Sequence, residues 1–165
     1  MEIADMIVAL QNKNFTNVKD ILPIQIERAT CDEKDEVRLF VLRNFSSRWA
    51  NQTSAAFTGE IITCFVAKVL GKVVGFACYD VKAKGMFGPL GVASDFRTKG
   101  VGTALTAAAL GAMQKEHYAY AVIGGVGEAQ PFYEKAFGAQ ALGTRADISN
   151  DAFYKICPKN EELPE

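Results

Sequence analysis

The sequence predicts an α/β fold built on a central sheet, and three observations lead to this prediction. Segments with strand-like and helix-like spacing alternate as strand, two helices, three strands, helix, strand, helix and two strands. A glycine-containing loop joins the end of one strand to the start of an alanine-rich helix. The length of 165 residues suits one globular domain with a sizeable core.

The first elements follow from apolar spacing. Residues 23–30 predict the first strand and residues 31–45 the first helix, with Asp32 as its N-terminal cap. The apolar face of that helix is expected to contain Val37, Phe40, Val41 and Phe45. Residues 46–57 predict a loop with a short second helix.

Residues 62–80 predict a β-hairpin. Gly71 and Lys72 suit a type II′ turn, which pairs Phe65 with Cys78 and leaves Cys64 on the opposite face from Cys78. We therefore expect no disulfide there. All four cysteines, including Cys31 and Cys157, are interpreted as small buried apolar side chains in a reducing compartment.

The second half of the chain continues the alternation. The strand at 84–92 contains Gly88-Pro89, and proline cannot donate to a sheet ladder, so a bulge is expected there. The helix after the glycine loop runs to about Glu116, because apolar residues recur at helical spacing at Leu105, Ala108, Ala109, Ala112 and Met113. Residues 118–125 predict a strand.

The helix at 128–139 has Pro131 in its first turn and Gly138 as its C-cap. Strands near 140–143 and 152–157 would close the sheet.

Composition restricts the function classes. The 18 Lys and Arg residues are dispersed and balance 19 Asp and Glu, which gives no support for nucleic-acid binding. The N-terminus lacks the basic start of a secretory signal, and no apolar run approaches the roughly 20 residues that span a bilayer. We expect a cytoplasmic protein with a small-molecule partner. No metal is expected, because His117 is the only histidine and no Cys-x-x-Cys pair occurs.

The segment DFRTKGVGTAL (95–105) has the features of a phosphate site. A helix start presents backbone N–H groups without partners, and glycine at 100 and 102 allows an anion to approach them closely. A P-loop motif is absent, and a dinucleotide fingerprint fails because Leu105 and Gln130 stand where glycine or alanine is needed. A turn or hinge remains the alternative at this point.

The segment LGVASDFRTKGVGTAL (90–105) resembles the acyl-CoA-binding segment of the GNAT superfamily of N-acetyltransferases, in which L-x-V is followed by [RQ]-x-x-G-x-[GA] and a helix. PFYEKAFGA (131–139) is similar to a later helix of that family. The likeness is clearest over residues 62–139, and the whole pattern looks like one bacterial subgroup of unassigned acceptor.

The resemblance implies a GNAT-like, mixed and mostly antiparallel sheet of six to seven strands, splayed by the bulge and flanked by helices. It implies an acetyltransferase domain at 23–157 that leaves an N-terminal extension at 1–22. The charge and the two prolines of residues 158–165 predict a flexible tail. The extension would add a strand or a dimer contact, so a homodimer is one option. The implied reaction is acetyl transfer from acetyl-CoA to an amine by direct attack, without a metal.

The resemblance also implies roles for individual residues. Backbone groups of Leu90 and Val92 would pair with the pantetheine arm of coenzyme A, and Tyr133 would stabilise the leaving thiolate. The pyrophosphate would bind near the side chains and backbone of Arg97, Thr98, Lys99, Gly100, Val101, Gly102 and Thr103.

The sequence departs from the family pattern in two places. The strand at 84–92 has no carboxylate to act as a general base, and Glu60 and Asp80 are more readily interpreted as solvated surface residues. Val126, among Gly124, Gly125 and Gly127, stands where the family often has asparagine. These departures keep an alternative open: a catalytically inactive acyl-CoA sensor or interaction module. A nucleotide-binding domain is a weaker one.

The acceptor that the resemblance implies is a small amine or a protein amine. In the family its selection falls to the first two helices and a late loop, here represented by Phe45, Arg48, Trp49 and residues 143–151 with Arg145. Trp49 is interpreted either as a wall for an apolar acceptor or as a core residue. His117, at the end of the long helix, is interpreted as structural.

Overall fold

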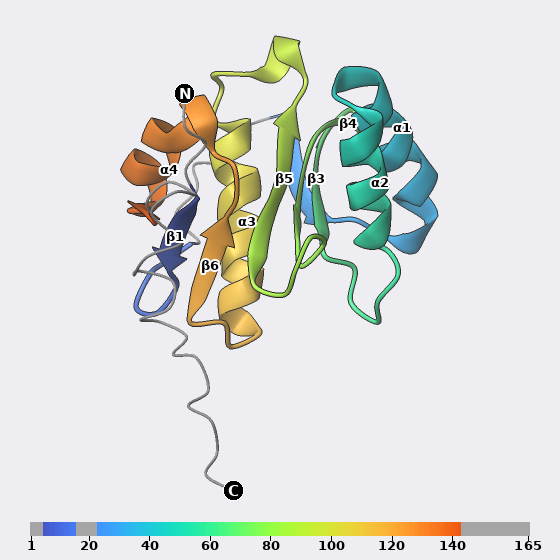
Figure 1. Cartoon of the computed structure of the whole chain (residues 1–165). Helices are drawn as coiled ribbons and strands as arrows, with labels where there is room; N and C mark the ends of the chain where they lie inside the picture. The colour runs from blue at the N-terminus through green and yellow to red at the C-terminus, as the bar shows by residue number, and fades with distance from the viewer. Residues whose placement is uncertain (1–4, 16–22, 143–165) are drawn as a thin grey trace, which may run out of the picture. The chain divides into compact units, whose positions relative to one another are not determined.

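The structure, a computed structural model, describes residues 5–15 and 23–142. The chain divides into a larger compact unit, residues 9–121, and a smaller one formed by residues 1–8 and 122–165. The described residues form four α-helices and seven strands, and the strand pairs β1–β7, β2–β3, β3–β4 and β4–β5 are antiparallel (Figure 1). The predicted mixed, mostly antiparallel α/β fold is confirmed.

The larger unit contains four neighbouring antiparallel strands in the order β2-β3-β4-β5. Their bounds are β2 (Ile24–Arg28), β3 (Cys64–Val69), β4 (Lys72–Tyr79) and β5 (Met86–Val92). β4 is the most deeply buried, because seven of its eight residues are buried. A strand covered on both faces reads as a continuous apolar run, which is what the segment from Val73 to Tyr79 shows.

The predicted hairpin exists, but its turn and register were predicted incorrectly. The two-residue loop is Leu70-Gly71, both with positive φ (49° and 77°), so that Val69 faces Lys72. The register then shifts by one residue, because Lys68 pairs with Val73 but Ala67 pairs with Gly75. This shift places Cys64 directly opposite Cys78. The two thiols therefore share a face, contrary to the prediction, and both are free.

The bulge predicted at Gly88-Pro89 is confirmed. Ala77 pairs with Leu90 and Tyr79 with Phe87, so two residues of β5 stand opposite the single residue Cys78. The Gly88-Pro89 peptide bond is cis, and Gly88 has φ 114°, a conformation that favours glycine.

Helices α1 (Lys34–Asn44) and α2 (Ser47–Ala55) cover one face of these strands, and α3 (Val101–Lys115) covers the other (Figure 1). Successive residues of β4 show this division. A Cβ on Gly75 would lie 3.0 Å from Leu105 of α3, whereas the Phe76 ring lies 5.8 Å from the ring of Phe45, next to α1.

The start of α1 differs from the prediction. A 3₁₀ turn (Cys31–Glu33) precedes the helix, and the Glu33 carboxylate accepts hydrogen bonds from the Thr30 N–H (2.7 Å) and hydroxyl (3.0 Å). Thr30 and Glu33 thus have the T-x-x-E spacing of a capping box, and Asp32 is not the cap. The predicted apolar face of α1 is confirmed, because Val37 and Val41 are fully buried and the two phenylalanines pack against the same core.

The smaller unit contains β1 (Met6–Ala9) up to Val8, together with β7 (Gln140–Ala141) and α4 (Gln130–Phe137), and β6 (Tyr120–Ile123) leads into it. Met6 pairs with Ala141, which shows that the N-terminal MIVA segment is a strand. The predicted caps of α4 are confirmed, with Pro131 in the first turn and Gly138 at φ 62°. The strand expected at 152–157 and the tail lie outside the described residues.

The cysteines are only partly as predicted. Cys64 and Cys78 are fully buried beneath α1 and α2, whereas Cys31 is exposed at the turn after β2. Cys157 lies outside the described residues. Within those residues, no three His, Cys, Asp or Glu side chains gather as a metal would need, and no helix is long and apolar enough to cross a membrane.

Candidate functional site

The loop between β5 and α3 presents a row of backbone N–H groups. Thr98 (φ 62°) and Gly100 (φ 84°) are both left-handed, and Gly100 is the N-cap of α3. A left-handed residue directly before the right-handed first turn of a helix is a geometry in which neighbouring N–H groups can face one anion, and Gly100 and Val101 have it. The positive end of the dipole of a 15-residue helix lies at the same place.

The first turn of α3 leaves its donors unused. In the part of the chain that the structure describes, no hydrogen bond is donated by the N–H of Val101, Gly102 or Thr103. A Cβ built on Gly102 would meet only the Val92 side chain, at 3.9 Å. An anion could therefore approach these N–H groups closely, so this helix start fits a phosphate group.

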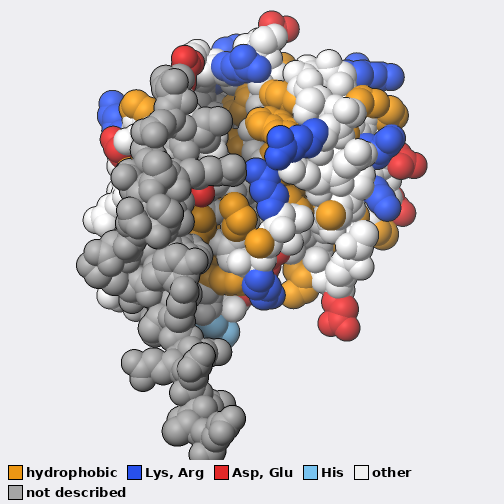
Figure 2. Space-filling model, viewed as in Figure 1, with side chains coloured by type: hydrophobic (Ala, Val, Ile, Leu, Met, Phe, Trp, Pro, Cys, Tyr) orange, Lys and Arg blue, Asp and Glu red, His pale blue; other side chains and the backbone are white. Residues whose placement is uncertain are grey.

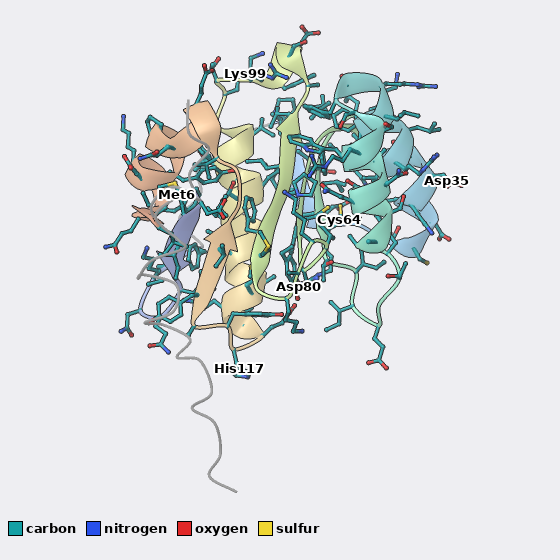
Figure 3. The ribbon with its side chains drawn as sticks, viewed as in Figure 1. Met6, Asp35, Cys64, Asp80, Lys99 and His117 are labelled. Atoms are coloured by element: carbon teal, nitrogen blue, oxygen red, sulfur yellow. The ribbon has the colours of Figure 1, made fainter. Side chains whose placement is uncertain are left out.

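Two cations flank the loop. The Nε of Arg97 donates to the carbonyl of Val92 (3.0 Å), and the Lys99 ammonium lies 5.5 Å from the centre of the Phe96 ring. Both side chains are exposed, and Figure 3 shows Lys99 at the top of the loop that precedes α3. Over the visible face of the molecule, Lys and Arg side chains are spread among apolar and uncharged groups (Figure 2).

β5 holds the two residues whose backbone was predicted to meet pantetheine. Leu90 pairs with Ala77 and Val92 pairs with Gly75. One edge of β5 is therefore paired with β4 at these two residues. The Val92 carbonyl also accepts the bond from Arg97. Within the larger unit, residues 90–103 thus form one continuous segment from strand to helix start.

Tyr133 belongs to α4 in the smaller unit. Its side chain is 6% exposed, and its ring lies edge-on to Phe132 with 4.9 Å between ring centres. Burial raises the pKa of Tyr133 well above its usual value. The phenol therefore remains protonated at neutral and moderately alkaline pH, and its chemistry is that of a hydrogen-bond donor.

Asp80 is not available as a general base. Its carboxylate accepts hydrogen bonds from the Gly85 N–H (2.7 Å) and the Tyr118 hydroxyl (2.5 Å), and the Lys84 ammonium lies 3.7 Å away. Figure 3 shows Asp80 at the opposite end of β5 from Lys99. Glu60, the other carboxylate considered, is exposed in the loop after α2.

The aromatic residues of the first two helices form a cluster. Phe45 lies 5.3 Å from Trp49 and 5.8 Å from Phe76 between ring centres, and Trp49 packs partly buried against the core. Trp49 is thus a packing residue that keeps some exposed surface. Arg48 is exposed, and residues 143–151 with Arg145 lie outside the described residues. Among the residues that the structure describes, the side-chain oxygen of Gln52 on α2 is buried and has no hydrogen-bond partner.

Sequence reasoning missed a polar network on the α3 side of the sheet. The Tyr79 hydroxyl donates to Glu116 (2.5 Å) and accepts from Arg28 (3.0 Å). These three residues are far apart in the sequence, on β2, on β4 and after α3, so no local motif could reveal them. Burial, followed by the bond to Glu116, raises the pKa of Tyr79 to about 12.

Comparison with known proteins places most of the chain in one family: residues 25–139 match the model of the acetyltransferase (GNAT) family. No curated protein matches the chain in sequence. Among solved structures, a fungal multi-domain GH3 β-N-acetylglucosaminidase with a GCN5-related glucosamine N-acetyltransferase region is 18% identical, with a TM-score of 0.70. A GCN5-related N-acetyltransferase from Sphaerobacter thermophilus is 17% identical (TM-score 0.66), and one from Kribbella flavida is 14% identical (TM-score 0.60).

These matches concern parts of larger proteins. Each covers 86% of this chain, but only 20%, 49% and 55% of the fungal, Sphaerobacter and Kribbella chains respectively. The chain thus spans from a fifth to just over half of their length. At such identities the likeness shows the fold that these proteins share.

Proposed function

The chain belongs to the acetyltransferase (GNAT) family, and on that premise we propose that it transfers an acetyl group from acetyl-CoA to an amine. The observation that carries the proposal is the start of α3, where three unused N–H groups follow the left-handed Thr98 and Gly100. This geometry suits the pyrophosphate of coenzyme A, whose thioester supplies the acyl group.

The proposed cofactor contacts run along one segment. Backbone N–H groups from Thr98 to Thr103 hold the pyrophosphate, and the exposed cations of Arg97 and Lys99 add positive charge at its rim. Backbone groups of Leu90 and Val92 hold the pantetheine arm as an added strand would be held. The bond from Arg97 to the Val92 carbonyl must open or be shared when the arm binds.

Tyr133 is the proposed catalytic residue. A thiolate leaves as the amine attacks, and a phenol at hydrogen-bond distance stabilises that growing charge. Full proton transfer is unfavourable, because a model phenol has a pKa of about 10 and a thiol about 8.5, and burial raises the pKa of Tyr133 further. The proposed role is therefore hydrogen-bond donation.

The acceptor amine must reach the site in its neutral form. An alkylamine with a pKa near 10 is about one part in a thousand neutral at pH 7. Since Asp80 is engaged in its own loop, we propose that the enzyme binds the neutral amine or passes its proton to water. The acceptor class is a small amine or a protein amine.

The second candidate is a coenzyme A sensor without turnover. The absence of an acidic residue from β5 and the presence of Val126 in the loop before α4 favour it. The buried Tyr133, held in a regular helix, favours catalysis.

Thermal unfolding with saturating acetyl-CoA, coenzyme A or ATP tests the proposal. A ligand at 100 times its Kd adds about 2.7 kcal/mol, or roughly 5 to 10 °C for a chain of this size. We expect stabilisation by both coenzyme A forms and not by ATP, and thiol release in an amine panel. Stabilisation without thiol release would select the sensor, and no shift with either form would overturn both candidates.

A further inference from the structure

The loop between β6 and α4 leads into the helix that carries Tyr133. Residues 124–127 are Gly-Gly-Val-Gly, so this part of the loop has no polar side chain of its own. Gly125 (φ 65°) and Gly127 (φ 50°) are left-handed, and among the described residues nothing beyond its chain neighbours lies within 4 Å of a Cβ built on Gly127. Glycine loses more conformational freedom on folding than any other residue. The loop therefore depends on outside contacts to keep one conformation.

Asp5 provides such a contact from the N-terminal segment. Its carboxylate accepts a hydrogen bond from the Gly125 N–H (2.8 Å), and its backbone carbonyl accepts one from the Leu142 N–H (2.8 Å). Asp5, Gly125 and Leu142 all belong to the smaller unit. Asp5 precedes residues 25–139, which match the family model, so the matched region alone does not hold the loop in this way.

The Asp5 side chain is used for a hydrogen bond and not for an ion pair. Four carboxylates are partly buried within residues 5–15 and 23–142. Three of them form ion pairs: Glu33 with Lys68, Asp80 with Lys84 and Glu116 with Arg28. The fourth, Asp5, has no cation beside it in that part of the chain, so its bond to the Gly125 N–H is the contact that accounts for its position. An ionised acceptor makes that bond stronger than a neutral one would.

We propose that Asp5 is a positioning residue for Tyr133. Its carboxylate fixes the loop at Gly125, and the loop sets the place at which α4 begins. The Ala129 N–H donates to the Val126 carbonyl (2.9 Å), which joins the loop to the start of α4, and Tyr133 is the fourth residue of that helix. A misplacement of about 1 Å can lower the rate of an enzyme about 100-fold. The inference rests on the proposed acetyl transfer, in which the Tyr133 hydroxyl donates to the leaving thiolate.

The kinetic test compares two variants of the whole chain. Asp5→Ala removes the acceptor, whereas the side-chain oxygen of Asp5→Asn can still accept from the Gly125 N–H. With glycinamide, tyramine and 1,4-diaminobutane as amines, Asp5→Ala should lower kcat for thiol release from acetyl-CoA about tenfold to 100-fold and leave the Kd for acetyl-CoA within about threefold of wild type. Asp5→Asn should stay within about threefold of wild type in both. Equal losses in the two variants would overturn the inference, because the bond to the loop would then not be the cause.

A second background shows whether Asp5 acts through the tyrosine. In Tyr133→Phe, the further change Asp5→Ala should leave the remaining rate unchanged, because a positioning residue acts only through the group that it places. The same fractional loss in both backgrounds would overturn the inference.

Hydrogen–deuterium exchange gives a measurement that needs no turnover. Asp5→Ala should raise amide exchange at Gly125 and in the first turn of α4 at least about tenfold. Asp5→Asn should not, and neither should Glu128→Gln, which changes an exposed carboxylate of the same loop. Thiol release by the wild type together with unchanged exchange in Asp5→Ala would overturn this inference alone. No thiol release by the wild type would overturn the proposed acetyl transfer and, with it, this role of Asp5.

Discussion

Gly91 of β5 lies directly beneath the ring of Phe45: a Cβ built on Gly91 would be 2.5 Å from the Phe45 Cζ and 2.8 Å from the Phe76 Cε1. No side chain can occupy that space without moving two rings of the buried cluster. The glycine therefore allows α1 and the loop before α2 to pack closely onto the sheet.

Gly91→Ala should destabilise the protein by about 1–3 kcal/mol, because overpacking a core displaces side chains from their preferred rotamers. Urea denaturation measures the loss. The double variant Gly91→Ala with Phe45→Leu should lose less than the sum of the two single changes, because the shorter side chain makes room. Additive losses would show that the contact is not the cause.

The ion pair between Glu33 and Lys68 should make stability depend on pH in the acidic range. Burial alone would raise the pKa of Glu33, but its bonds to Lys68 and Thr30 lower it below the usual value. A depressed carboxylate pKa gives stability that is present above about pH 4.5 and is lost as pH falls through the folded pKa.

Lys68→Gln should therefore cost about 1–3 kcal/mol at pH 7, because Glu33 stays mostly buried with a weaker partner. The difference from wild type should shrink towards pH 3, where Glu33 is protonated in both proteins. Lys72→Gln, at an exposed position of β4, is the matched control in urea titrations at each pH. A difference that does not change with pH would argue against the ion pair.

These contacts show what could be read from the sequence and what could not. Apolar spacing was enough for the strands and helices, and Gly88-Pro89 was enough for the bulge, because each depends on a few adjacent residues. The sequence also contains the T-x-x-E capping signal at Thr30, although Asp32 was the predicted cap. This signal predicts that the Glu33 side chain bonds back to Thr30.

The register of the β3–β4 hairpin could not be predicted from the neighbouring residues in the sequence. Leu70 occupies a left-handed position that usually favours glycine, asparagine or aspartate, and its side chain is 92% exposed, so no burial pattern marks it. The register shift near Ala67 then brought Cys64 opposite Cys78. The bond between Asp5 and Gly125 and the network of Arg28, Tyr79 and Glu116 join residues that are 37 or more positions apart, which no sequence spacing encodes.

Tyr133→Phe should lower kcat by about 10²–10³-fold, the loss typical of one donor to a developing anion, and leave the Kd for acetyl-CoA unchanged. Tyr120→Phe, at a tyrosine that is 55% exposed, is the control. Steady-state kinetics and calorimetric binding separate the two effects. A variant that binds acetyl-CoA more weakly but turns over at the wild-type rate would assign Tyr133 to packing.

The cysteines should take no part in the reaction. Cys31 is exposed, whereas the neighbouring Cys78 thiol and burial raise the pKa of Cys64 well above its usual value. Iodoacetamide should therefore modify Cys31 in the native protein and spare Cys64 and Cys78, as mass spectrometry would show, with turnover retained. Loss of turnover with acetyl-CoA binding preserved would point to an acyl-enzyme route.

The most direct measurement of the central claim is calorimetric titration of acetyl-CoA into two variants at one position of the helix start. Gly102→Ala adds a Cβ that has room, and Gly102→Asp adds the same Cβ with a carboxylate where the pyrophosphate should bind. Both should be at least as stable as wild type, because glycine is a poor helix residue and an acid suits the first turn. We predict a Kd within about threefold of wild type for the alanine variant and at least about 100-fold weaker binding for the aspartate variant, since like charges at 4 Å cost about 4 kcal/mol near a protein surface. Equal affinity of the two variants would contradict the account, because acetyl-CoA would then bind away from the start of α3.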